Sequence, residues 1–250
     1  MRCPGQDTQY WQPDAIYEVK CPECERMVEF FKDDTTRKCE HCGHKFPNPK
    51  MDFGCAAYCK YAEQCIGDLP PELIAQQQDL LKDRVAVEMK KYFKRDFRRI
   101  GHASRVAHFA EKIGKAEEAD MAIVLIAAYL HDIGIPEAER KHGSGAPKFQ
   151  EAEGPPVARA LLEKLGAAPG LMGEVCDIVG RHHSPGPEES VNYRSVYDAD
   201  LIVNLEDAEK KREEPLSPER LESIVEKSFL TETGAKMARE VLGAKDGVGA

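Results

Sequence analysis

Apolar residues recur at helical intervals in the chain from about residue 72 onward. Val85, Met89, Phe93, Phe97 and Ile100 follow one another three or four residues apart, which is typical of the buried face of a helix. The same periodicity predicts helices over 117–132, 155–165, 169–183, 194–212 and 218–242. No alternation typical of strands interrupts these stretches. The pattern therefore predicts a mainly α protein with a helical domain over residues 69–250.

The segment 134–156, "GIPEAERKHGSGAPKFQEAEGPP", differs from its surroundings because it is long and rich in Gly and Pro. Loops of this size in compact domains are usually lids or binding loops. We therefore expect a functional loop here, between two helices.

The first 68 residues lack helical periodicity and hold eight of the nine cysteines. Pro70 and Pro71 follow, and proline is favoured where a helix begins. This change predicts a domain boundary, with a small cysteine-rich module over residues 1–68. A module of this size buries little apolar surface, so we expect a bound metal to stabilise it.

Four of these cysteines have the spacing of a zinc ribbon. They lie in "CPEC" and "CEHC", two C-x2-C pairs that are fourteen residues apart, and two such tight turns can surround one tetrahedral zinc ion. The stretch "RMVEFF" between the pairs predicts a short strand, a short β-hairpin is expected in the module, and a glycine follows the second pair. The expected zinc ligands are Cys21, Cys24, Cys39 and Cys42.

The other four cysteines of the module form a second, weaker set. They can hold another zinc ion or an iron-sulfur cluster, since either uses four thiolates. The alternative is that some of them are free buried thiols. The set comprises Cys3, Cys55, Cys59 and Cys65.

Charge and hydropathy narrow the classes of partner. The formal net charge of −9 makes nucleic-acid binding unlikely, because that binding depends on many Lys and Arg contacts to phosphates. The longest apolar run, 121–130, is too short to cross a bilayer, and the first residues carry no apolar signal core. We therefore expect a cytoplasmic protein with no membrane partner.

Histidine and aspartate stand side by side at the end of that apolar run, as His131 and Asp132. The face of His131 also carries Val124, Ala127 and Ala128, so the histidine is predicted to point inward. Further imidazoles and carboxylates end other helical stretches, and helical proteins build metal sites by bringing such groups together. These further candidates are His102, His182, His183 and Asp200.

The blocks "RIGHASRVA", "AAYLHDIG", "IVGRHH" and "DADLIVNL" resemble, in this order, the HD superfamily of metal-dependent phosphohydrolases. The family pattern H…HD…D corresponds here to His102, His131 with Asp132, and Asp200, and the resemblance covers about residues 85–210. It implies an all-helical HD-type domain that holds a divalent metal ion (Mn, Co, Fe, Ni or Mg). It also implies hydrolysis of phosphate esters or anhydrides, often of nucleotides.

Two positions have competing candidates. His108 is an alternative to His102, although the neighbours of His102 match the family block better. Asp198 is an alternative to Asp200, and the family pattern favours Asp200. Asp198 is then expected to lie behind the ligands or to face solvent.

The segment after the His-Asp pair departs from the family pattern. Members with two metal ions usually carry another histidine near the part that reads "KFQEAEGPPVARALL" here, and this chain has Gln150, Glu151 and Glu153 instead, with His142 upstream. A second metal ion is therefore in doubt. Glu153 is a candidate catalytic base or ligand, and the alternative is a solvated loop glutamate.

Candidate groups for the reaction lie beside these ligands. Asp132 is expected to bind the metal ion and to orient its water. Arg98 and Arg105 share a helical face with His102 and are candidates for binding a substrate phosphate. Lys148 and Arg181 are weaker candidates, and the alternative for these residues is a solvated basic surface.

The predicted function is a metal-dependent phosphohydrolase that acts on a small phosphorylated substrate, such as a nucleotide. A homodimer is compatible with this reading. One alternative is a regulatory or binding protein, in which the HD domain senses a nucleotide or a metal and the ribbon binds a partner. Another alternative is a di-iron oxygenase, against which the missing histidine argues.

Overall fold

The computed structural model describes residues 16–31, 34, 36–50, 71–211 and 216–243, with the backbone alone for 71–79. The chain divides into two compact units, Met1–Leu80 and Leu81–Ala250. The boundary predicted near residue 68 lies outside the described residues, as does the second cysteine set, Cys3, Cys55, Cys59 and Cys65.

Among the described residues of the N-terminal unit, 16–50 form two antiparallel hairpins, and the unit also includes the start of α2 (Pro71–Phe93). Strand β1 (Ile16–Lys20) pairs with β2 (Met27–Phe31), and β3 (Thr36–Lys38) pairs with β4 (Lys45–Pro47). One face of the first hairpin forms a small core, where Phe30 contacts Phe46 edge to face at 5.3 Å between ring centroids. Buried Asn48 joins the hairpins, since its amide nitrogen donates to the carbonyls of Phe31 and Asp34. The predicted hairpin is therefore confirmed.

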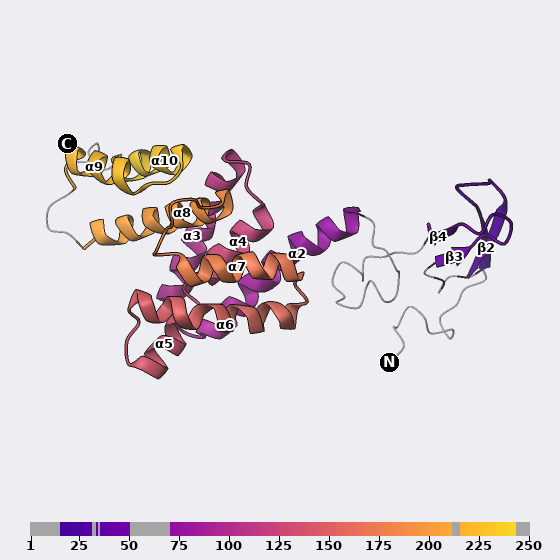
Figure 1. The fold of residues 1–250 in the computed structure, drawn as a ribbon, viewed down its shortest axis with the longest axis horizontal. Helices are drawn as coiled ribbons and strands as arrows, with labels where there is room; N and C mark the ends of the chain where they lie inside the picture. The colour runs from indigo at the N-terminus through magenta and orange to yellow at the C-terminus, as the bar shows by residue number, and fades with distance from the viewer. Residues whose placement is uncertain (1–15, 32–33, 35, 51–70, 212–215, 244–250) are drawn as a thin grey trace. The chain divides into compact units, whose positions relative to one another are not determined.

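The second unit is entirely helical in its described part (Figure 1). Helix α4 lies at its centre and packs against α3, α7 and α8, while α5 and α6 lie on one side and α9 and α10 on the other. The helices are α2 (Pro71–Phe93), α3 (Phe97–Ala116), α4 (Met121–Leu130), α5 (Ile135–His142), α6 (Pro147–Leu165), α7 (Pro169–Arg181), α8 (Val191–Glu209), α9 (Pro218–Ser228) and α10 (Glu232–Gly243).

Side-chain caps explain where several helices begin. Asp120 accepts hydrogen bonds from the backbone of Ala122 and Ile123 and so starts α4, and Ser190 does the same for α8. Helix α4 is apolar on almost every side because neighbouring helices surround it. This placement carries the end of α4, with His131, into the interior.

Membrane-spanning potential is limited to one stretch of the described residues, Met121–His142. By length and composition alone this stretch is apolar enough to cross a bilayer, but 61% of its most apolar window is buried inside the protein. That burial is common for the core helix of a globular fold.

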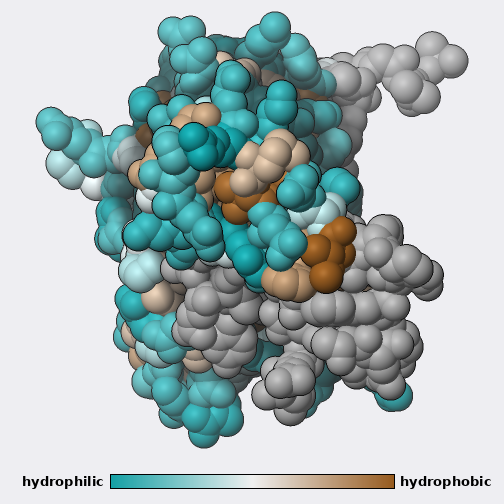
Figure 2. Space-filling model, turned by 90° about the vertical axis from the view of Figure 1, so that its right-hand side faces the viewer, coloured by the Kyte–Doolittle hydropathy of each residue, from teal (hydrophilic) through white to brown (hydrophobic). Residues whose placement is uncertain are grey.

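On the face drawn in Figure 2, hydrophobic residues form small patches among hydrophilic ones.

The loop predicted over 134–156 was wrong, because α5 and α6 occupy most of this segment. Pro136 and Pro147 lie in the first turns of these helices. Backbone N–H groups have no partner within the helix at these positions, so a proline there costs no hydrogen bond. Pro155 and Pro156 lie within α6. Gly134, Gly143 and the two leading prolines thus mark helix starts and ends rather than a lid.

Two details of the helical pattern also differ. Phe97 was expected on the buried face of one helix with Phe93, but α2 ends at Phe93 and the side chain of Phe97 is 75% exposed at the start of α3. Lys94 has a left-handed φ of 55°, which breaks the helix there. The single helix expected over 218–242 is two helices, α9 and α10.

Asp198 explains the break between α9 and α10. It is fully buried and accepts hydrogen bonds from the backbone N–H groups of Leu230 and Thr231 and from the Thr231 hydroxyl. Thr231 in turn accepts a hydrogen bond from the backbone N–H of Gly234 and so caps α10, and Asp198 holds this capping residue in place. Of the two alternatives for Asp198, exposure to solvent is therefore wrong, and its hydrogen bonds go to Leu230 and Thr231 rather than to the candidate ligands.

Candidate metal centre

Three helices bring the predicted ligands together. His102 lies in the first half of α3, His131 caps the end of α4 with Asp132 directly after it, and Asp200 lies in the middle of α8. His131 is 1% exposed and Asp200 5%. The four side chains are thus far apart in sequence and close in space.

The ligand atoms of His102, His131 and Asp200 all lie within 4.8 Å of one another. His102 Nε2 is 3.2 Å from His131 Nε2 and 2.9 Å from Asp200 Oδ1. Asp132 Oδ2 is 3.7 Å from His102 Nε2 and 3.5 Å from His131 Nε2. Ligands about 2 Å from a shared cation have separations of this order, so the group can hold one divalent ion.

Hydrogen bonds behind the ligands fix their orientation. His131 Nδ1 lies 2.8 Å from the carbonyl oxygen of Ala128, which assigns its proton to Nδ1 and leaves Nε2 as a lone-pair donor towards the cluster. Asn204 Nδ2 donates to Asp200 Oδ2 at 3.0 Å, while Oδ1 faces the histidines. This support is typical of metal-binding histidines and carboxylates.

A second group of possible ligands shares Asp132. Asp132, His182 and His183 also offer ligand atoms within 4.8 Å of one another, and Asp132 Oδ1 lies 3.7 Å from His182 Nε2. The two oxygens of Asp132 therefore face different sets of histidines. A carboxylate in this position can bridge two cations.

The end of α7 allows both adjacent histidines to point inward. Helix α7 ends at Arg181, and His182 is its cap, with Nδ1 2.9 Å from the carbonyl oxygen of Val179. His182 Nε2 and His183 Nδ1 are buried and make no hydrogen bond in the described structure. Leaving buried polar atoms without partners is costly, and a bound cation would satisfy these two.

Helix α6 braces this second group from behind. The carboxylate of Glu151 accepts hydrogen bonds from the backbone N–H of His183 at 3.0 Å and from the hydroxyl of Ser184 at 3.3 Å. The turn after Asp132 packs on the same helix, and a Cβ at Gly134 would lie 2.4 Å from the carbonyl oxygen of Gln150. Sequence reasoning mentioned Glu151 but missed this role, because nothing in the residue pattern marks it.

The electrostatics of the cluster favour a cation. Burial alone would raise the pKa of Asp132 and of Asp200, but the neighbouring His131 holds the pKa of each carboxyl well below its usual range. Burial lowers the pKa of His131, and the two carboxylates more than reverse this effect. The carboxylates thus attract positive charge to the cluster, and a metal ion held by the same atoms would supply it in place of a proton on His131.

A pocket of about 380 Å³ opens beside the cluster. It reaches His102 and Asp132, so a ligand bound in it can contact the metal centre. This volume lies within the range of small-molecule sites. The lining residues are Arg98, Arg99, His102, Asp132, Ile135, Asn204, Asp207, Ala208 and Lys211.

Of the four basic residues predicted to bind substrate, only Arg98 lines this pocket. Arg105 is paired with Glu206 and Asp207. Arg181 is paired with Asp177 and Glu189, and these carboxylates raise the pKa of its guanidinium.

Lys148 and Glu153 also lie outside the grouped ligands. The ammonium of Lys148 lies 4.6 Å from the ring centroid of Phe149. Glu153 pairs with Lys141 at 2.5 Å and with His142 at 3.0 Å, and both cations lower the pKa of its carboxyl. The geometry therefore gives Glu153 a contact between α5 and α6 rather than a place at the cluster.

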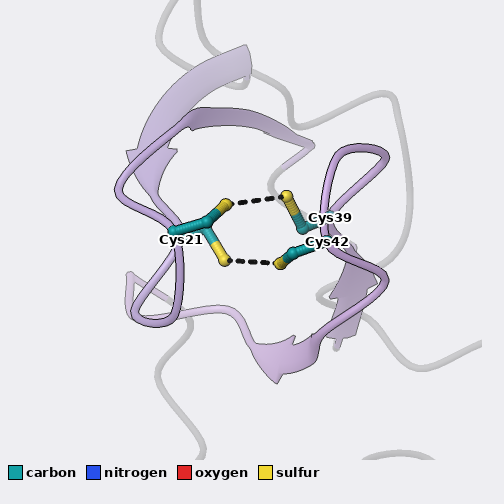
Figure 3. A group of neighbouring side chains, drawn as sticks. Cys21, Cys39 and Cys42 are labelled. Carbon is teal, nitrogen blue, oxygen red and sulfur yellow. Dashed lines mark hydrogen bonds between the residues drawn. The ribbon is translucent and has the colours of Figure 1, made fainter.

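The four ribbon cysteines converge in the N-terminal unit. Cys21 Sγ is 3.6 Å from Cys42 Sγ, and Cys24 Sγ is 3.6 Å from Cys39 Sγ. Figure 3 shows Cys39 and Cys42 facing Cys21 from the opposite turn. Gly43 has the left-handed φ of 77° that the second turn requires. The set fits a tetrahedral metal ion.

Comparison with known proteins agrees with the geometry. The HD domain family matches residues 99–246, which include all the grouped ligands of the helical unit. No curated protein matches the chain.

Among solved structures, the chain is similar to a predicted HD superfamily hydrolase from an uncultured Thermotogales bacterium, with 26% identity over 67% of this chain and 86% of that one (TM-score 0.46). It is also similar to Bacillus subtilis YpgQ, with 19% identity over 68% of this chain and 93% of that one (TM-score 0.47). Because the family match covers more than half of the sequence, this chain belongs to the HD domain family.

Proposed function

We propose that this protein is a metal-dependent phosphohydrolase that cleaves a phosphate ester or anhydride of a nucleotide. One observation carries the proposal: two imidazoles and two carboxylates from three helices lie within reach of one point, at the edge of an open pocket. Family membership supports the same chemistry.

A divalent ion in this cluster would lower the pKa of a bound water and neutralise charge on a phosphoryl oxygen. The protein's own groups supply position. Asp132 is ionised and can accept a hydrogen bond from the attacking water, and Arg98 in the pocket wall can bind a phosphate of the substrate that lies outside the metal centre. Phosphoryl transfer depends mainly on such positioning and charge.

The two groups of candidate ligands in the helical unit indicate how many divalent ions it could bind. His102, His131 and Asp200 would hold one, and His182 with His183 would hold another, with Asp132 shared between them. We therefore expect up to two divalent ions in the helical unit and one zinc ion in the cysteine ribbon. The ribbon's metal is proposed to be structural, since its ligands are four cysteines and leave no open position.

The test combines metal analysis with a screen of nucleotides and a generic phosphomonoester. The metal-loaded protein should hydrolyse at least one of them, and His131→Ala should lose metal and at least about 100-fold in kcat/KM. His108→Ala is the matched control, because His108 lies on α3 outside both ligand groups, and it should keep both.

Each outcome separates this proposal from its alternatives. Binding of a nucleotide without turnover would favour a sensor, and oxygen consumption by the iron-loaded protein would favour an oxygenase. Equal metal content in the His131→Ala variant and the wild type would contradict the proposal that these residues form a metal centre.

A further inference from the structure

The pocket beside the metal centre carries positive charge that the protein does not neutralise. Three of its lining residues are basic: Arg98, Arg99 and Lys211. Arg99 is already bound, at 2.9 Å from Asp96 and 2.5 Å from Glu139. Arg98 and Lys211 make no ion pair within the part of the chain that the structure describes.

The carboxylates that line the pocket do not neutralise Arg98 and Lys211. Asp207 is held by Arg105 and by Lys210, the latter at 3.2 Å. Asp132 belongs to the metal centre. Arg98 and Lys211 are therefore available to bind an anion that is not part of the protein. A guanidinium group together with an ammonium group can bind phosphate oxygens.

The position of Lys211 indicates a ligand longer than one phosphoryl group. Lys211 follows Asp200 by eleven residues, and the part of α8 between Asp200 and its end at Glu209 alone rises roughly 13 Å at 1.5 Å per residue. The same pocket nevertheless reaches both Lys211 and the metal-centre residues His102 and Asp132. A phosphoryl group at the metal centre would leave the region near Lys211 unfilled.

We propose that Arg98 and Lys211 bind a second phosphoryl group of the substrate, so that the preferred substrate carries two phosphoryl groups rather than one. This inference rests on the proposed function for the first phosphoryl group, which reacts at the metal centre. If the two groups are contiguous, the water oxygen forms the new bond to the terminal phosphorus and the bridging P–O bond breaks. The bridging oxygen then keeps the electron pair on the leaving phosphate, and the water's proton passes to solvent.

The experiment compares substrates that differ only in phosphoryl groups: AMP, ADP and adenosine 3′,5′-bisphosphate. The wild type should prefer a substrate with two groups over AMP by at least about 10-fold in kcat/KM. ADP and the bisphosphate separate contiguous from spaced groups. Arg98→Ala and Lys211→Ala should each lower kcat/KM for the preferred substrate by about 10-fold or more, with less than about 3-fold for AMP.

Matched controls have the same change of charge elsewhere. Arg140→Ala and Lys115→Ala each remove a cation from a surface ion pair outside the pocket lining, and both should behave like the wild type. Equal losses for AMP and for the substrate with two groups, or no loss in either pocket variant, would overturn the inference.

A binding measurement keeps this inference separate from the proposed function. Calorimetry should find pyrophosphate bound at least about 10-fold more tightly than orthophosphate by the wild type, and this preference should vanish in Arg98→Ala and Lys211→Ala. If no nucleotide is hydrolysed, the proposed function is wrong. The preference for pyrophosphate would still show whether Arg98 and Lys211 form an anion-binding site. Equal binding of pyrophosphate and orthophosphate by the wild type, together with equal binding of adenosine 3′,5′-bisphosphate and AMP, would refute this inference.

Discussion

Asn204 holds the candidate metal ligand Asp200 in place and lies outside the group of candidate ligands itself. Its side-chain amide donates to Asp200 Oδ2, and this leaves Oδ1 for the histidines. Removing such a partner typically costs 10- to 100-fold in metal affinity. Asn204→Ala should therefore weaken divalent-ion binding roughly 10-fold, as measured by metal titration.

The control for this experiment is Lys210→Ala, which removes an exposed side chain just after the same helix. It should bind metal like the wild type. An Asn204→Ala variant with unchanged affinity would mean that Asp200 needs no such support.

Residue types and spacing were sufficient to choose the ligands but not their neighbours. His102, His131, Asp132 and Asp200 carry the chemistry in their own side chains, so motif and helical phase could identify them. The helical phase also selected Arg105, which the structure pairs with carboxylates of α8. The helical phase predicts which way a side chain points, whereas the residue that it pairs with depends on which helix packs against that face.

The same limit explains the residues that were missed. Asn204 follows Asp200 by four residues and so lies on its face of α8, which was a usable signal. Lys211 and Arg99 gave no comparable signal, because only the packing of α3 and α8 brings them to one pocket.

At the scale of elements, the buried carboxylate of Asp198 joins α8 to the start of α10. All its hydrogen-bond partners are donors, and Asp198→Asn would turn an amide N–H towards them. We expect the variant to lose about 1–3 kcal/mol in the free energy of unfolding at pH 7. Chemical denaturation would measure this loss.

The same residue predicts a pH dependence. Burial raises the pKa of Asp198 to about 6, despite hydrogen bonds that lower it. Between its unfolded pKa, near 4, and that value, the folded state binds more protons than the unfolded state, so this group's contribution to stability falls as pH rises.

The difference in unfolding free energy between the wild type and Asp198→Asn should therefore shrink from pH 4 to pH 6, because the variant lacks this ionisation. A difference that grows over this range would show that the three donors outweigh burial and that the carboxylate's pKa is lowered. Titrating groups common to both proteins cancel in the comparison.

Helix existence was predictable and helix ends were less so. Apolar periodicity located the buried faces of α2 and α7, because burial on one side imposes that pattern. Helix α4 was instead marked by its continuous apolar run, since its neighbours enclose it. The segment 134–156 was misread because Pro and Gly are compatible both with a loop and with the ends of short helices. Phe97 fits the period of α2 but lies beyond its end.

At the scale of the molecule, the two units depend on metal to different degrees. The helical unit has an extensive apolar core, whereas the described core of the ribbon consists of Cys21, Val28, Phe30, Cys39 and Phe46. Two of these five residues are zinc-ligand candidates, so loss of metal removes part of the core as well as the cross-link.

Cys21→Ser should therefore abolish zinc binding by the ribbon and make residues 16–50 sensitive to proteolysis. The helical signal in circular dichroism should change little, since the helices belong to the other unit. Cys176→Ser is the matched control, because Cys176 is a buried thiol of α7 outside the cysteine group. Retention of full zinc content by Cys21→Ser would contradict the ribbon assignment.

The sequence by itself determined the fold class, the family and the identity of the grouped ligands. These follow from local properties, namely the period of burial, the C-x2-C spacing and the donor atoms that particular side chains carry. The tertiary structure alone decided which cations have no ion pair among the described residues, that Asp132 lies between two histidine groups, and that Asp198 holds the residue that caps α10. Those features depend on contacts between segments far apart in the chain, and such contacts exist only once the helices have packed.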